Sequence, residues 1–135
     1  LIGEPEIAFQ EMIFSTPMLQ VLSIVVVLLA AVVEELVFRG ALYTALLNLR
    51  RDGGQGWRRH VLPCVVTASL FALVHLLAGF ETFSAILQIF LLSAFLTGLR
   101  AWTGSVRASM AAHVFWNSLA ALALILYNLL QPLTF

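Results

Sequence analysis

Four long apolar runs, separated by short polar or glycine-rich stretches, dominate the pattern of hydrophobic and polar positions in this chain. They extend over about Met18 to Leu49, Val61 to Ala78, Phe83 to Trp102 and Val106 to Leu129. As helices rising about 1.5 Å per residue, all four are long enough to cross a hydrocarbon core of about 30 Å. The first, at roughly 32 residues, exceeds that thickness and must tilt or project from the membrane. The pattern predicts an all-α fold, a polytopic transmembrane helical bundle of about four core helices.

Composition supports the membrane assignment and narrows the partners. Hydrophobic residues make up 61% of the 135 residues and charged residues only 10%, whereas a soluble domain needs a charged surface. The net charge is +0, so no excess of positive charge points to nucleic acid, and the lipid bilayer is the expected surrounding. The single cysteine, Cys64, excludes an internal disulfide and a Cys-rich metal site.

The length predicts a single membrane domain over residues 1–135, with residues 1–17 as an interfacial or linker segment. The chain starts at Leu1 and shows no charged n-region ahead of an apolar stretch, so no signal peptide is predicted. We expect it to be the C-terminal core of a longer chain with further helices before it.

The arginines predict the orientation of the spans. All but Arg39 fall in or beside the connections between the first and second and between the third and fourth runs: Arg50, Arg51, Arg58, Arg59, Arg100 and Arg107. Three crossings place those two connections on the same side, and Glu4, Glu6, Glu11 and Glu81 on the other. The positive-inside rule then puts the Arg-rich loops in the cytoplasm and both termini outside, in what we expect to be a bacterial plasma membrane.

Polar residues inside the spans are the candidates for chemistry. An ionised side chain costs at least ~2.5 kcal/mol at the bilayer centre, so it needs a partner or a function. Six such positions can meet in a polar site enclosed between the helices: Glu34, Glu35, Arg39, His75, His113 and Asn117.

Helical spacing separates the two adjacent glutamates. Glu35 and Arg39 lie at i and i+4, on one helix face, and can neutralise each other as a buried pair; a structural and a catalytic role are both open for them. Glu34 lies about 100° around the helix and has no such cation on its own helix. A carboxylate in that position suits a general base.

The histidines extend the candidate site to two other helices. His75 alone is compatible with a simple interhelical hydrogen bond, and His113 with Asn117, at i and i+4, with an interhelical polar clamp. Together with Glu34 they favour water attack on a peptide bond, with Glu34 as base and His75, His113 and Asn117 stabilising the oxyanion. A zinc site built from Glu34, His75 and His113 is an equally open alternative. Measured along each helix from the expected cytoplasmic boundary of the membrane, Glu34 lies about 13 Å deep and His113 about 10 Å deep. His75 lies deeper, at about 21 Å, so the counted depths bring Glu34 and His113 together but not His75.

These residues form three motifs in order: Glu34-Glu35…Arg39, Phe71…His75 and His113…Asn117. Over roughly Val25 to Leu122 the chain resembles the CPBP family of intramembrane proteases, also called the CAAX prenyl protease 2 or ABI family. Its motifs are E-E-x-x-x-R, F-x-x-x-H and H-x-x-x-N/D. Relatives usually carry additional helices before the first motif.

The resemblance implies an intramembrane endopeptidase, of metallo- or glutamate type, that cuts near the C-terminus of a membrane-associated protein or peptide. Prenylated proteins and C-terminal sorting signals are the substrates that it suggests. It implies that Glu34 activates water, that His75, His113 and Asn117 frame the oxyanion, and that Glu35 and Arg39 hold the site together. Zn²⁺ and a metal-free mechanism are both open. The alternative is a non-enzymatic membrane protein of the same fold, in bacteriocin self-immunity or as a scaffold.

Overall fold

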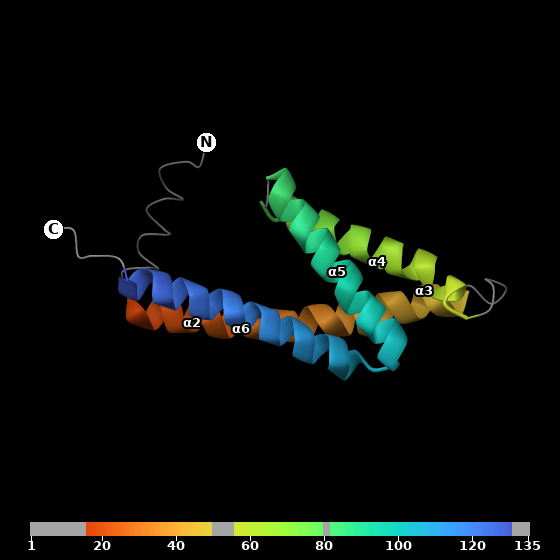
Figure 1. The fold of residues 1–135 in the computed structure, drawn as a ribbon, viewed down its shortest axis with the longest axis horizontal. Helices are drawn as coiled ribbons and strands as arrows, with labels where there is room; N and C mark the ends of the chain where they lie inside the picture. Colours follow the sequence, from red (N-terminus) through yellow and green to blue (C-terminus); the bar gives the residue numbers. More distant parts are fainter. Residues whose placement is uncertain (1–15, 50–55, 80–81, 131–135) are drawn as a thin grey trace. The chain divides into compact units, whose positions relative to one another are not determined.

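The computed structural model describes residues 16–49, 56–79 and 82–130, and every regular element in them is helical (Figure 1). The elements are α2 (Pro17–Glu35), η1 (Leu36–Leu42), α3 (Tyr43–Leu49), α4 (Arg58–Leu77), α5 (Phe83–Thr103) and α6 (Val106–Leu130). The predicted all-α fold is confirmed for this part of the chain. Residues 1–17 were predicted to form an interfacial or linker segment. Residues 1–15 of it lie outside the described residues, so that prediction is not tested.

Four helical stretches are long and apolar enough to cross a membrane: Pro17–Leu49, Arg58–Leu77, Phe83–Thr103 and Val106–Tyr127. They correspond to the four predicted runs and indicate an integral membrane protein. The second begins earlier than predicted, because Arg58 and Arg59 form the first turn of α4 instead of ending a loop. Charged side chains are compatible with a helical backbone, so a boundary drawn from hydropathy alone is too short here.

The first span is helical throughout but not α-helical throughout. Pro17 occupies its first position, where the missing N–H costs nothing. From Leu36 to Leu42 the backbone winds as a π-helix, and the N–H of Tyr43 bonds the carbonyl of Phe38, five residues back. The sequence predicted an ordinary helix here. Wide turns of this kind are rare and are frequent at functional sites.

Backbone contacts divide the chain into two compact units. One contains α2 up to Ala31 and α6 from Val114, two helices that run along each other (Figure 1). The other comprises Val32–His113, and in it α4 and α5 pack side by side with η1 and α3 against α4. The single domain predicted from the length stays a prediction.

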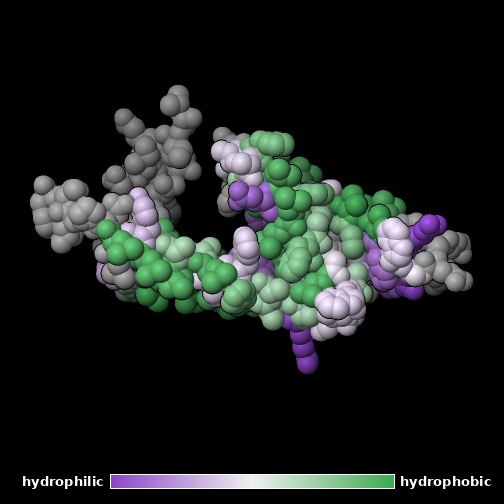
Figure 2. Space-filling view, in the orientation of Figure 1, coloured by the Kyte–Doolittle hydropathy of each residue, from purple (hydrophilic) through white to green (hydrophobic). Residues whose placement is uncertain are grey.

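The Val32–His113 unit has polar residues inside and apolar ones outside. Its buried apolar side chains are few, among them Ala68, Ala72 and Leu96, and small residues on α4 and α5 allow the helices to approach closely. Its buried polar set is larger: Glu35, Arg39, Thr67, Ser93, Thr97, Ser109 and His113. Large aliphatic side chains cover much of the visible face (Figure 2). This inverted distribution suits a lipid surrounding.

Gly104 ends α5 in the left-handed conformation, with φ of 68°, and its N–H bonds the carbonyl of Arg100 at 3.0 Å. We expect Gly104→Ala to lower the free energy of unfolding by about 1 kcal/mol, since a Cβ disfavours this conformation. Gly98→Ala, in the interior of the same helix and with open space for a Cβ, is the matched control and should be neutral or stabilising. Unfolding in detergent measures both, and equal effects of the two substitutions would contradict the assignment.

Candidate active site

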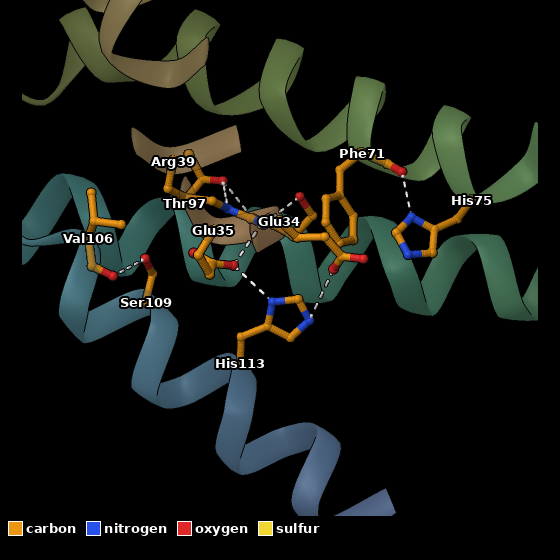
Figure 3. A network of polar contacts seen from close by, with 10 residues as sticks. Glu34, Glu35, Arg39, Phe71, His75, Thr97, Val106, Ser109 and His113 are labelled. Atoms are coloured by element: carbon orange, nitrogen blue, oxygen red, sulfur yellow. Dashed lines mark hydrogen bonds and ion pairs between the residues drawn. The ribbon is translucent and has the colours of Figure 1, made fainter. Parts of the chain in front are cut away.

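Glu35 lies at the centre of a buried polar network in the Val32–His113 unit (Figure 3). Its Oε1 accepts from Nη1 of Arg39 at 2.9 Å and from Nδ1 of His113, also at 2.9 Å. Its Oε2 is buried and has no hydrogen-bond partner among the described residues. The predicted Glu35–Arg39 pair is confirmed as a contact, and the structure adds His113 as a second donor to the same oxygen.

Arg39 is fully buried and is held mainly from α5. Its Nη2 donates to Ser93 Oγ at 2.7 Å and to the Ser93 carbonyl at 3.0 Å, and its Nε donates to Thr97 Oγ1 at 3.2 Å. Such charge-assisted bonds are stronger than those between neutral groups. Ser93 and Thr97 were not predicted as site residues from the sequence. Their signal was two hydroxyl residues at i and i+4 in an apolar span, which is weak because Ser and Thr commonly bond their own helix.

Phe71 lies between the groups contributed by three helices. Its ring centroid is 4.8 Å from the Arg39 guanidinium carbon, 4.4 Å from the His75 ring centroid and 6.0 Å from that of His113. It also meets Phe38 edge to face, at 4.9 Å between centroids. With 2% exposure, Phe71 fills the space beside the network. This explains why a Phe precedes the histidine by one turn.

Glu34 differs from Glu35 in exposure and in partners. Its side chain is 29% exposed, against 0% for Glu35, and its Oε2 lies 3.8 Å from Nε2 of His113. This separation is too long for a direct hydrogen bond, but a water can lie within about 2.8 Å of both atoms. The two ring nitrogens of His113 thus face the two adjacent glutamates.

His75 lies on α4, and its ring is directed toward Phe71 and the side of the network where Glu34 lies (Figure 3). Its Nδ1 is 2.9 Å from the carbonyl of Phe71, which can only accept, so Nδ1 carries a proton. In the neutral ring the lone pair is then on Nε2. The ring contact with Phe71 links His75 to the same aromatic side chain that His113 contacts.

The structure places five of the six predicted site residues in one unit: Glu34, Glu35, Arg39, His75 and His113. Asn117 belongs to the other unit, where its Nδ2 donates to the carbonyl of Val27 at 3.4 Å. Its predicted role is therefore untested by this arrangement.

Within residues 16–49, 56–79 and 82–130, no three His, Cys, Asp or Glu side chains are grouped so that they could hold a metal ion. The predicted zinc ligands Glu34, His75 and His113 do not form a ligand set as they stand. Zinc binding thus has no geometric support here and stays a prediction.

A comparison with protein-family models matches residues 16–119 to the type II CAAX prenyl endopeptidase Rce1-like family. The match includes all six predicted site residues. No curated protein and no solved structure matches the chain significantly.

Proposed function

The chain belongs to the type II CAAX prenyl endopeptidase Rce1-like family, and we propose that it is an intramembrane endopeptidase. Its substrate would be a membrane-associated protein or peptide, cut near the C-terminus. The observation that carries the proposal is the arrangement around His113, whose Nδ1 is fixed by the buried Glu35 while its Nε2 faces the part-exposed Glu34. Such an arrangement provides an oriented imidazole beside a carboxylate that solvent can reach.

In the proposed reaction, Glu34 takes a proton from a water, and the water oxygen bonds to the carbonyl carbon of the scissile peptide. The tetrahedral intermediate collapses as the C–N bond breaks, and the proton held by Glu34 passes to the leaving amine. One water is consumed, and its second proton passes from the new carboxyl group to the amine, so that a carboxylate and an ammonium group are formed. No redox partner is required.

His113 can stabilise the oxyanion when it carries a proton on each ring nitrogen. Nδ1 then donates to Glu35, and Nε2 donates to the developing negative charge. In that form, the charges of Glu34 and Glu35 are balanced by those of Arg39 and His113.

The geometry favours a different role for His75 from the one predicted from the sequence. The Phe71 carbonyl accepts from Nδ1 of His75, so this nitrogen is not available to an oxyanion, and the ring is held on the side of the network where Glu34 lies (Figure 3). We therefore propose that His75 assists Glu34 in orienting the attacking water. The role of Asn117 as an oxyanion donor stays a prediction.

The arginine distribution supports a proposed cellular setting. The Arg-rich connections would face the cytoplasm of a bacterial cell and both ends of this segment the outside. Substrates with a prenylated C-terminus or a C-terminal sorting signal both fit the proposed reaction.

Cleavage of a defined peptide tests the proposal. We expect the purified protein in detergent to cut a quenched-fluorescent peptide ending in farnesylated Cys-a-a-X and to release a tripeptide, identified by mass spectrometry. An unprenylated copy and a peptide carrying a sorting signal are run beside it to define the substrate. Absence of cleavage of all three would favour the non-enzymatic scaffold or immunity protein.

The same assay tests whether cleavage depends on zinc. Activity that survives chelation, in protein with far less than one metal ion per chain, would support the metal-free mechanism. Activity that is lost on chelation and restored by Zn²⁺ would support the metallopeptidase.

A further inference from the structure

We propose that Ser93 and Thr97 on α5 are positioning residues for the reaction, acting through Arg39. The inference rests on the proposed endopeptidase function. None of the three motifs lies on α5, yet among the described residues this helix supplies three of the four acceptors of Arg39. The fourth acceptor is Glu35, the carboxylate that orients His113.

The hydroxyl of Thr97 is directed by its own helix. Its proton goes to the carbonyl of Ser93, at 2.7 Å, so its lone pair is available to Nε of Arg39 at 3.2 Å. The Ser93 carbonyl in turn also accepts from Nη2 of Arg39. Ser93 and Thr97 therefore form one preorganised acceptor surface that fixes both the position and the plane of the guanidinium.

Fixing Arg39 matters because Glu35 is held at one oxygen. Oε1 accepts from both Arg39 and His113, whereas Oε2 has no partner in the described part of the chain. A shift of the guanidinium would therefore move Oε1 and, with it, the imidazole. Nε2 of His113, 3.8 Å from Glu34, is the atom whose position would change at the reacting centre.

Neutral hydroxyls are suited to this task. Glu35 already balances the charge of Arg39, so a second carboxylate on α5 would leave an excess negative charge in a buried site. Hydroxyl and carbonyl oxygens satisfy the remaining guanidinium protons without adding charge. Both side chains are fully buried, so water does not compete for these bonds.

The test uses Thr97→Val, which keeps the shape of the side chain and removes the acceptor. We expect kcat for the farnesylated Cys-a-a-X peptide to fall about 10- to 100-fold with KM little changed, because residues that orient a reacting group typically have effects of this size. Thr97→Ser, which retains the hydroxyl, should recover most of the activity, and Ser93→Ala should resemble Thr97→Val. Rates are determined per folded molecule from the monodisperse fraction, so that a lower yield does not affect kcat.

Thr103→Val is the matched control. Thr103 also lies on α5, and its hydroxyl also donates to a carbonyl one turn back, that of Leu99 at 2.8 Å. It accepts from the N–H of Ser105 at 3.2 Å, so its partners lie at the end of α5 and not in the network. We expect it to keep the wild-type kcat. The inference is overturned if wild type cleaves and Thr97→Val keeps the wild-type kcat, or if Thr97→Ser is as impaired as Thr97→Val. Absence of cleavage by wild type would instead overturn the proposed function.

Discussion

Glu34→Gln is expected to lower kcat for peptide cleavage by about 10²- to 10⁴-fold, the usual contribution of a general base. Glutamine has nearly the same shape but cannot take the proton of the attacking water. The loss should occur without unfolding, because Glu34 is 29% exposed and its Oε2 lies 3.8 Å from Nε2 of His113, beyond the range of a direct hydrogen bond. Cleavage of the farnesylated Cys-a-a-X peptide, measured beside thermal unfolding, provides both readouts.

Two comparisons sharpen this prediction. Glu34→Asp keeps a carboxylate but withdraws it by one methylene, so it should retain part of the activity that Glu34→Gln loses. Glu35→Gln should instead lose stability, because Arg39 would keep its buried charge without a counter-ion. If Glu34→Gln retained the wild-type kcat and a well-folded Glu35→Gln did not, the proposed roles of the two glutamates would be exchanged.

Arg39→Met is expected to lower the free energy of unfolding by about 3–5 kcal/mol, the cost of breaking a buried pair by removing one partner. The substitution leaves the fully buried Glu35 carboxylate without its cation and leaves Ser93 and Thr97 without their donor. Arg107→Met, an exposed arginine at the start of α6, is the control and should change stability by less than about 0.5 kcal/mol.

The double variant Glu35→Gln with Arg39→Met distinguishes charge burial from catalysis. It removes both charges, so most of the stability lost in Arg39→Met should return. Activity should not return, because neither side chain would orient His113 as in the wild type. A double variant as unstable as Arg39→Met would show that the pair's electrostatics are not what stabilises this unit.

The sequence predicted those features that depend on local spacing. The span positions follow from apolar runs, and the Glu35–Arg39 contact follows from the i, i+4 relation on one helix. The separation of Glu34 from Glu35 was predicted by the same geometry. These features need no knowledge of how the helices pack.

Features that depend on packing were not predicted. Ser93 and Thr97 are identified only once α5 lies beside Arg39, since serine and threonine in an apolar helix usually bond their own backbone. His75 was expected deeper than its partners, counted along a straight helix. The ring of Phe71, one turn before it, contacts the His75 and His113 rings alike. One aromatic side chain thus lies near both rings although their depths along the helices differ.

The π-helical turns at Leu36–Leu42 also change which face of the first span each later side chain occupies. One additional residue in a turn displaces all later side chains by about 100° relative to an unbroken helical wheel. A wheel drawn from Pro17 would thus place Tyr43, which is 1% exposed, on the wrong face. Removing one residue from this stretch would restore a regular α-helix. Glu34 and Glu35 would then be rotated relative to the residues that follow the stretch, and their present alignment with His113 would be lost. The spacing of this segment is therefore as restrictive as the identity of its residues.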